Sequence, residues 1–360
     1  MDSYNFALIK PVSGSCCLHC RYCFYRDETV NRKVSSYGTM SEETLKRAVM
    51  YTAGNAVHGS TFLFQGGEPL LAGISFYQHY NELCQDIAAL RPDFTISSCV
   101  QTSAYLLKKD MVRVLKEGHF LVGVSLDGPE KLHDLNRTTV NGRGSFKQVF
   151  SNTELLRAQA IPVNILCVVT KDNARAQELW RFFMDNGFDY LQFIKGLAPI
   201  GSDQELISSE HFADFFLEIF DLWFSEFTKG HYVSVRMIDD LFAALSGRGI
   251  SSCDLRGQCS VQNVIEADGS IYPCDFYVLD EWKLGSVCDS PVTVSSSIAR
   301  SFTKKLSLPR ACLDCNALAV CKNGCRRYRG SNNLSAYCQT FRRLLSSKKE
   351  QITYVLKHCL

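Results

Sequence analysis

A short loop with three closely spaced cysteines, Cys16, Cys20 and Cys23, constrains this chain more than any other feature of its sequence. The spacing is C-x3-C-x2-C, and thiolate sulfur is a soft ligand that suits zinc, Cu(I) and iron–sulfur clusters. A four-iron cluster takes four protein ligands, and this loop supplies three. A metal centre with one open position can bind and activate a substrate, whereas a fully ligated centre is structural. A zinc knuckle or a set of buried cysteines would explain the same residues.

The whole chain contains 17 cysteines among its 360 residues. Residues 1–5 lack the charged start and following apolar stretch of a secretory signal. We therefore expect a cytoplasmic protein, in which thiols stay reduced and cysteine-rich patterns bind metals more often than they form disulfides. Six scattered cysteines lie mostly among apolar neighbours, and we interpret them as core residues. They are Cys17, Cys84, Cys99, Cys167, Cys288 and Cys359.

Length and charge narrow the class of protein further. A chain of 360 residues predicts about two domains, each large enough to bury a core. The net charge is +2 without a long basic run, so we expect no nucleic-acid partner. No apolar run approaches the roughly 18 residues that span a bilayer, so we expect no membrane association.

Short apolar runs alternate with helical patterns over the first two thirds of the chain. This alternation is typical of βαβ units and a parallel sheet. Six such units are too few to close an eight-fold barrel, so we predict an α/β fold with an open, partial (β/α)6 barrel. Ser41, followed by Glu42 and Glu43, predicts a helix start. The expected strands cover residues 6–9, 61–65, 94–101, 120–126, 163–170 and 190–194, with helices expected at 104–117, 146–159, 211–229 and 237–245.

Polar and glycine-rich loops follow these strands, and we expect them to share one face of the barrel, where ligands collect. The clearest is Gly66-Gly67-Glu68-Pro69, directly after the second strand. Two glycines at a strand end let the backbone approach a ligand closely. Ordinary turn residues are the alternative interpretation, above all for Gly128 before Pro129.

The composition changes at Cys253, after a glycine-rich segment at residues 246–249. We predict a barrel at 1–230, a linker helix region at 231–252, a cysteine-rich domain at 253–340 and a C-terminal helix at 341–360. Eight further thiolates in this part make two complete four-ligand sites, and either zinc ribbons or iron–sulfur clusters fit them. The eight are Cys253, Cys259, Cys274, Cys312, Cys315, Cys321, Cys325 and Cys338.

Together these patterns resemble the anaerobic sulfatase-maturating enzymes, which are radical S-adenosylmethionine (SAM) enzymes with a SPASM domain. The resemblance covers nearly the whole chain and rests on the eleven spaced cysteines together with several other segments. These segments are residues 18–25, 64–69, 120–129, 164–170, 191–194 and 268–280. The fold it implies is the partial barrel followed by a small cysteine-rich iron–sulfur (SPASM) domain.

The resemblance implies three 4Fe–4S clusters as cofactors, besides SAM. Cys16, Cys20 and Cys23 would hold the cluster that binds SAM. Two auxiliary clusters would be fully ligated by cysteine, with interleaved ligand sets. The first set is Cys253, Cys259, Cys274 and Cys325, and the second is Cys312, Cys315, Cys321 and Cys338.

The resemblance also assigns other site residues. Arg137 is chemically suited to a carboxylate such as that of SAM, although a surface arginine in an ordinary salt bridge is the alternative. Asp275 would be the catalytic proton acceptor, although beside Cys274 it could also be a simple turn residue. Tyr25 and Gln65 are predicted peptide contacts. The implied SAM-binding residues are Tyr22, Gly66, Gly67, Ser125, Arg137 and Leu197.

Two departures from the family pattern stand out. Cys17 replaces the usual asparagine, at a position that is not a cluster ligand. Ser103 and Ala104 replace the usual Asn-Gly after the third strand. Serine has no amide, and alanine restricts the backbone where glycine does not, so local contacts to SAM or substrate are expected to differ.

The implied activity is oxidation of a cysteine or serine in a sulfatase peptide to Cα-formylglycine. A 5′-deoxyadenosyl radical would take a Cβ hydrogen, and methionine and 5′-deoxyadenosine would be released. The implied partners are an unfolded sulfatase polypeptide and a reducing electron donor of the flavodoxin or ferredoxin type, and we expect a monomer. One alternative is a SPASM peptide maturase that forms thioether or carbon–carbon crosslinks. The other is a zinc-binding adaptor without enzyme activity.

Overall fold

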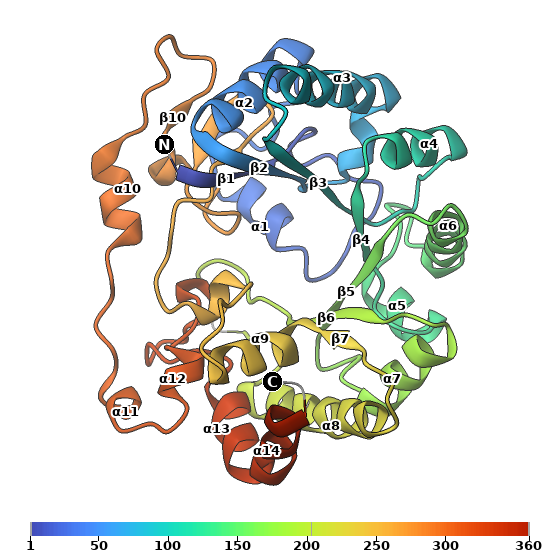
Figure 1. Cartoon of the computed structure of the whole chain (residues 1–360), viewed down its shortest axis with the longest axis vertical. Helices are drawn as coiled ribbons and strands as arrows, with labels where there is room; N and C mark the ends of the chain where they lie inside the picture. The colour runs from blue at the N-terminus through green and yellow to red at the C-terminus, as the bar shows by residue number, and fades with distance from the viewer. Residues whose placement is uncertain (1, 203, 359–360) are drawn as a thin grey trace. The chain divides into compact units, whose positions relative to one another are not determined.

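The computed structural model describes residues 2–202 and 204–358, and the chain divides into two compact units. The first unit contains Met1–Leu126, Asn136–Val163 and Ser260–Thr303. The second contains Asp127–Leu135, Asn164–Cys259 and Lys304–Leu360. Each unit is therefore assembled from segments that are far apart in the sequence (Figure 1).

The first unit is built on a parallel sheet in which neighbouring strands follow chain order. Its strands are β1 (Asp2–Ile9), β2 (Ala56–Phe64), β3 (Thr95–Thr102) and β4 (Leu121–Ser125). Ile9 pairs with Phe64, which pairs in turn with Val100. The carboxyl ends of β1 and β2 are thereby aligned, so the loops that follow them start side by side.

Helices follow the strands of the first unit as the βαβ pattern predicts (Figure 1). They are α1 (Phe24–Val30), α2 (Glu42–Gly54), α3 (Ile74–Leu90), α4 (Lys109–Glu117), α6 (Phe146–Ala158) and α10 (Ser296–Thr303). The predicted start of α2 is confirmed, because the Ser41 hydroxyl accepts a hydrogen bond from the Thr44 N–H at 3.1 Å. The predicted start of α4 at residue 104 is wrong. Ala104 has a left-handed backbone with φ of 57°, which no right-handed helix can include.

Aromatic side chains fill the core between β2, β3 and α3. Phe64 lies at the centre, with its ring centroid 4.8 Å from that of Tyr80 and 5.2 Å from that of Tyr77. Phe62 and Phe120 complete this group, and all five side chains are essentially inaccessible to solvent. Edge-to-face packing of this kind adds to the hydrophobic gain from burial. This packing therefore fixes the position of β2, the strand that leads into Gly66.

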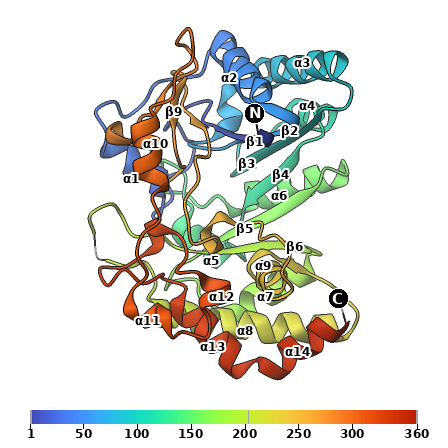
Figure 2. The same ribbon diagram turned by 60° about the vertical axis from the view of Figure 1, so that its left-hand side comes forward.

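A short hairpin extends the same sheet beyond β1, and the sequence patterns did not predict it. Its strands are β8 (Val264–Ile265), β9 (Ser270–Tyr272) and β10 (Gly285–Ser286). β8 pairs parallel to the end of β1, and β9 pairs antiparallel to β8 (Figure 2). This pairing brings Glu266 and Asp275 beside the carboxyl end of the first strand of the chain.

The second unit contains the parallel strands β5 (Val163–Val169, of which the first residue belongs to the first unit), β6 (Tyr190–Lys195) and β7 (Ser234–Val235). Its helices are α7 (Ala176–Asp185), α8 (Ser209–Thr228), α9 (Arg236–Leu245), α11 (Arg310–Leu313), α12 (Leu318–Cys321), α13 (Cys338–Ser347) and α14 (Lys349–His358). Most of α5 (Glu130–Asn136) also belongs to this unit.

The long aromatic helix α8 is a packing element, as its apolar stripe predicts. Phe212, Phe216 and Trp223 are buried along it, and α13 packs against it. An exposed ion pair between Arg343 and Asp214, 2.6 Å apart, links the two helices at the surface. Among the residues that the structure describes, no helix has the length and apolar character needed to cross a membrane.

Candidate active site

The loop with the three cysteines is held by the backbone of residues 136–138. The N–H groups of His19 and Arg21 donate to the carbonyl oxygens of Thr138 and Asn136, at 2.7 and 3.0 Å. Arg137 is the residue between these two carbonyl groups, so the same hydrogen bonds hold it next to the loop. Backbone hydrogen bonds thus fix the loop against residues 136–138.

The thiols of this loop and the Arg137 guanidinium form one electrostatic group. Arg137 Nη1 donates to Cys20 Sγ at 3.9 Å, and its guanidinium carbon lies 5.2 Å from the ring centroid of Tyr22. The pKa of the Cys23 thiol is raised by burial and by the charge of Cys16, whereas Arg137 lowers it. The structure therefore places Arg137 and Tyr22, two of the predicted SAM-binding residues, beside the loop that carries the three predicted ligands.

Gly66 and Gly67 have left-handed backbones, with φ of 112° and 57°. A Cβ on Gly67 would lie 2.2 Å from the carbonyl oxygen of Ser15, and one on Gly66 would lie 2.9 Å from the side chain of Lys10. The Glu68 N–H donates to that same Ser15 oxygen at 2.8 Å. Only glycine fits both positions, because the segment after β2 lies directly against the backbone that enters the cysteine loop.

The Glu68 carboxylate anchors the loop that follows β3. It accepts hydrogen bonds from Thr102 Oγ1 at 2.6 Å, from the Ser103 N–H at 2.9 Å and from the Ser103 hydroxyl. Ser103 therefore binds this buried carboxylate without the amide of the usual asparagine. Its hydroxyl also lies 3.8 Å from Cys17 Sγ, so the two departures from the family pattern contact each other.

The remaining predicted SAM-binding residues end two strands. Ser125 closes β4, and its hydroxyl accepts a hydrogen bond from Gln101 Nε2 at 3.1 Å. Leu197 belongs to the second unit, where it follows β6 and is nearly buried. Both lie at carboxyl ends of strands, where the barrel pattern predicts ligand contacts.

Asp275 is buried and held by two side chains. Its carboxylate forms an ion pair with Lys10 and accepts a hydrogen bond from Gln65 Nε2 at 2.7 Å. Lys10 directly follows β1 and its side chain is completely buried, whereas Gln65 directly follows β2. Sequence reasoning missed Lys10, because a lysine after an apolar strand looks like the exposed end of that strand. The predicted base and one predicted peptide contact, Gln65, are thus direct neighbours.

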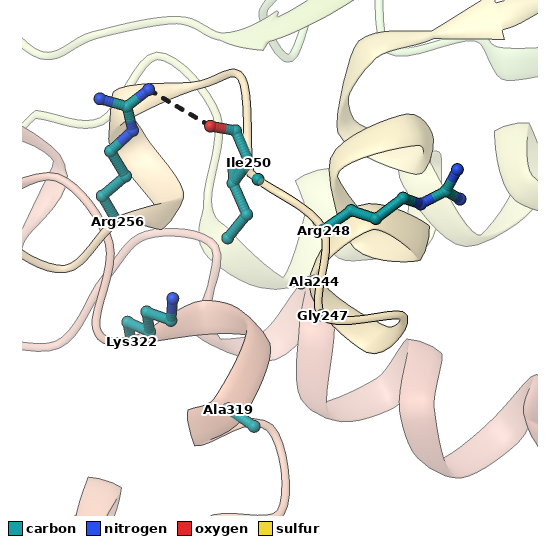
Figure 3. Close-up of a pocket in the computed structure, with 8 residues that line it drawn as sticks. Ala244, Gly247, Arg248, Ile250, Arg256, Ala319 and Lys322 are labelled. Carbon is teal, nitrogen blue, oxygen red and sulfur yellow. Dashed lines mark hydrogen bonds between the residues drawn. The ribbon is translucent and has the colours of Figure 1, made fainter.

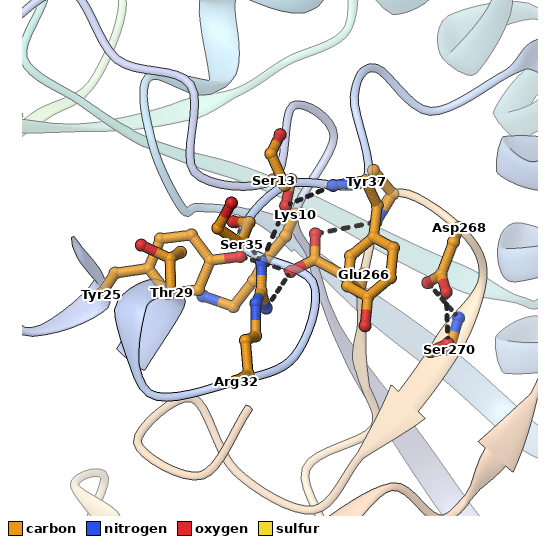
Figure 4. Close-up of polar contacts among 12 residues, drawn as sticks. Lys10, Ser13, Tyr25, Thr29, Arg32, Ser35, Tyr37, Glu266, Asp268 and Ser270 are labelled. Carbon is orange, nitrogen blue, oxygen red and sulfur yellow. Dashed lines mark hydrogen bonds and ion pairs between the residues drawn. The ribbon is translucent and has the colours of Figure 1, made fainter. Parts of the chain in front are cut away.

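Lys10 also belongs to a group of buried polar side chains that includes Tyr25, Arg32 and Glu266 (Figure 4). Lys10 Nζ lies 3.7 Å from the ring centroid of Tyr25, whose hydroxyl donates to Glu266. Glu266 forms an ion pair with Arg32 at 2.8 Å, and Arg32 Nη2 donates to Ser13 Oγ at 2.9 Å. Burial and the charge of Glu266 raise the pKa of Tyr25 well above its usual value. With 3% of its surface exposed and its hydroxyl bound to Glu266, Tyr25 supports Lys10 in this structure, and its contact with a peptide stays a prediction.

The cysteines of the second unit form two groups. In the first, Cys325 has a pKa raised to about 12, chiefly by burial and then by the charges of Cys253 and Cys259. Cys274, the fourth member of that predicted ligand set, belongs to the first unit beside Asp275. Such charge effects require proximity, so three members of the predicted set lie near one another.

The second group is complete within this unit. The pKa of Cys321 is raised to about 11, chiefly by burial and in smaller part by the charges of Cys338, Cys312 and Cys315. The cysteines of the described chain are all free thiols. Within residues 2–202 and 204–358, no three or more His, Cys, Asp or Glu side chains converge closely enough to hold a single metal ion.

The sequence model of the Radical SAM superfamily matches residues 11–182. This range contains the cysteine loop, Gly66-Gly67 and Arg137, the residues that the geometry above brings together.

Relatives that match over nearly the full length define the family more narrowly. A cysteine-type anaerobic sulfatase-maturating enzyme from Clostridium novyi is 36% identical, over 97% of this chain and 96% of its own. The solved structure of hexahistidine-tagged anSMEcpe with bound AdoMet has a TM-score of 0.91 at 34% identity, covering 99% of this chain and 96% of that one. The structure of native anSMEcpe with bound AdoMet and the Cp18Cys peptide has a TM-score of 0.89 at 33% identity, covering 99% and 100%.

The chain therefore belongs to the anaerobic sulfatase-maturating enzymes, a family of radical SAM enzymes. The likeness to solved structures over nearly the whole chain also confirms the predicted α/β fold class. The predicted domain boundaries and the roles of individual site residues stay predictions.

Proposed function

We propose that this chain oxidises a cysteine in a sulfatase peptide to Cα-formylglycine, in a reaction that consumes SAM. Family membership supports the reaction class, and the cysteine-type relative from Clostridium novyi favours cysteine over serine as the target. The single structural observation that supports it most is the buried Asp275, held by Lys10 and Gln65 at the ends of the two strands that lead into the SAM loop and the glycine pair.

The donor set fits a cluster with an open position. Cys16, Cys20 and Cys23 are free thiols on one loop, and Arg137 donates to the second of them. A cluster bound there supplies an electron that splits SAM and yields an organic radical. Arg137 has five N–H donors, so it can bind a carboxylate while still facing Cys20. We assign SAM binding to this guanidinium, the backbone at Gly66 and Gly67, and Tyr22, Ser125 and Leu197.

Asp275 is the proposed proton acceptor. The substrate Cβ loses a hydrogen atom, and its thiol loses a proton to the Asp275 carboxylate. Auxiliary clusters held by the remaining cysteines would accept the one electron that is released. Hydrolysis of the resulting thioaldehyde then gives formylglycine and releases the sulfur as hydrogen sulfide. Lys10 and Gln65 hold the two carboxylate oxygens in place, which keeps the base oriented toward the peptide.

The eight remaining cysteines are the proposed ligands of two auxiliary clusters, which bring the total to three. The pKa shifts support this division. The charges of Cys253 and Cys259 raise the pKa of Cys325. The pKa of Cys321 is raised instead by the charges of the second set, Cys312, Cys315 and Cys338. We also propose a cytoplasmic monomer that receives electrons from a carrier of the flavodoxin or ferredoxin type.

The proposed activity is tested with a Cys-x-Pro-x-Arg peptide, SAM and the reconstituted enzyme under strictly anaerobic reducing conditions. We expect a peptide that has lost its sulfur and reacts as an aldehyde, together with stoichiometric 5′-deoxyadenosine. A matched Ser-x-Pro-x-Arg peptide should turn over more slowly. A product that keeps the sulfur and forms a crosslink would contradict the proposal and favour the crosslinking alternative.

Removal of the predicted SAM cluster should leave the auxiliary clusters in place. We expect the combined variant Cys16→Ala, Cys20→Ala and Cys23→Ala to fall from about twelve to about eight irons per chain and to release no 5′-deoxyadenosine. Cys17→Ala is the matched control, because Cys17 lies on the same loop without a predicted ligand role, and it should keep its full iron content. Zinc without iron in the wild type would favour the adaptor alternative instead.

A further inference from the structure

A cavity of about 430 Å³ lies in the second unit, at the end of α9 (Figure 3). Arg248 and Arg256 reach it from the loop that follows α9, and Lys322 reaches it from the end of α12. All three side chains are exposed. None of the described residues that line the cavity is acidic, so its wall carries three positive charges.

The acidic groups nearest in the chain are turned inward and do not neutralise these charges at the surface. Asp240 is buried and accepts hydrogen bonds from the Ser251 N–H at 2.7 Å and from the Ser252 N–H at 3.2 Å. The Asp254 side chain is likewise withdrawn from the surface, since its Oδ1 atom is inaccessible to solvent. The exposed rim of the cavity therefore attracts anions.

The cavity is built on chain segments that carry members of both predicted auxiliary ligand sets. The Arg256 N–H donates to the Cys253 carbonyl oxygen at 3.2 Å. Lys322 lies between Cys321 and Cys325 in the sequence. Gly257 joins the two segments, because a Cβ there would lie 2.5 Å from the Lys322 carbonyl oxygen. A partner seated on the cavity would therefore rest against the backbone that holds these thiols.

We propose that this cavity and its three cations, Arg248, Arg256 and Lys322, form the docking site for an acidic one-electron carrier protein. The proposal rests on the proposed function, in which each turnover leaves one electron on the auxiliary clusters. At this site that electron passes to the oxidised carrier, which is reduced by one electron, and no covalent bond forms or breaks. Small, salt-sensitive interfaces of complementary charge are typical of electron-transfer partners.

The test measures electron transfer separately from catalysis. Enzyme with prereduced clusters is mixed with oxidised flavodoxin, and flavin reduction is followed at increasing salt. We expect the variant Arg248→Glu, Arg256→Glu and Lys322→Glu to transfer electrons at least about tenfold more slowly at low salt, and to lose most of the salt dependence. Formylglycine formation in a single turnover with dithionite should be unchanged, because dithionite reduces the enzyme without a docking site and the auxiliary clusters can hold the one electron that is released.

The matched control is Lys46→Glu, Lys109→Glu and Lys116→Glu, which makes the same change in net charge at exposed positions of α2 and α4. It should stay within about twofold of the wild type, since these three lysines belong to the first unit and none of them lines the cavity. Equal slowing of both variants, or wild-type transfer in the cavity variant, would overturn the proposal. If iron content falls in the triple variant, Arg248→Glu alone carries the same expectation, because Arg248 Nε donates to the hydroxyl of its near neighbour Ser246 and not to the cysteine segments.

Two further outcomes distinguish carrier docking from simple anion binding and from failure of the proposed activity. If inorganic phosphate saturates the cavity while flavodoxin reduction is unaffected, the cavity binds small anions and the docking proposal is wrong. If dithionite-driven wild-type enzyme makes no formylglycine, the proposed function fails. Flavodoxin reduction by the prereduced clusters would still report on docking in that case.

Discussion

Asp275→Asn should lower the rate of formylglycine formation by about 10²–10⁴-fold, while SAM is still cleaved to 5′-deoxyadenosine. The amide cannot accept the thiol proton, but it keeps nearly the same shape and can still accept a hydrogen bond from Gln65. The cysteine loop and Arg137 are untouched by this change. The diagnostic measurement is therefore the ratio of oxidised peptide to 5′-deoxyadenosine, which should fall sharply.

The control for this substitution is Asp280→Asn. Asp280 is exposed and accepts a hydrogen bond from the Lys33 N–H at 2.8 Å, so it belongs to the same unit but not to the site. It should keep the wild-type ratio. Because Asp275→Asn also leaves the buried Lys10 charge without its carboxylate, iron content and unfolding are measured in parallel, at a temperature where both variants are folded. Normal turnover by folded Asp275→Asn would exclude Asp275 as the base.

The regular part of the fold was predictable from the sequence because it repeats. Strands β1 to β6 lie where apolar runs alternate with helical patterns, and the bounds of β5, Val163–Val169, differ from the prediction by one residue. Strands β1 and β2 begin earlier than predicted, at Asp2 and Ala56 rather than at residues 6 and 61. The hairpin strands β8 to β10 were not predictable, since two or three residues carry no measurable period. Yet this hairpin is what brings Asp275 to the end of β1.

The cysteines of the site were easy to find because their spacing is unusual, whereas the charged residues around them gave no local signal. Lys10 and Glu266 are completely buried and lie far apart in the sequence. Nothing in the residues next to Lys10 shows that it is buried, and the partners of a buried charge are set by tertiary contacts. The useful clue would have been its place at the end of an apolar strand, directly before the cysteine loop.

The departures from the family pattern show how different side chains can fill one role. Ser103 was expected to change local contacts because it lacks an amide, and its N–H and hydroxyl bind Glu68 instead. Ala104 takes a left-handed backbone at a cost of about 1–2 kcal/mol. Asn152 offsets part of this cost by donating to the Ala104 carbonyl oxygen at 2.6 Å. These compensating contacts cannot be recognised from the two substitutions in the sequence alone.

Arg32→Met should lower the free energy of unfolding by about 3–5 kcal/mol, because it leaves Glu266 as an uncompensated buried charge. Both side chains of this ion pair are completely inaccessible to solvent, at an N–O distance of 2.8 Å. The Tyr25 hydroxyl would remain as a donor to Glu266, but a neutral donor replaces only part of the interaction. Urea denaturation of anaerobically prepared protein, followed by circular dichroism, measures the change.

The matched control is Arg47→Met, which breaks an exposed pair with Glu43 at the same N–O distance of 2.8 Å. Water already solvates those two charges, so the loss should stay below about 1 kcal/mol. Adding Glu266→Gln to Arg32→Met should restore part of the lost stability, because the second change removes the stranded charge. An equally small loss of unfolding free energy in Arg32→Met and Arg47→Met would show that burial of the Arg32–Glu266 pair has no energetic consequence. The role that we assign to this pair in holding Lys10 and Asp275 would then be wrong.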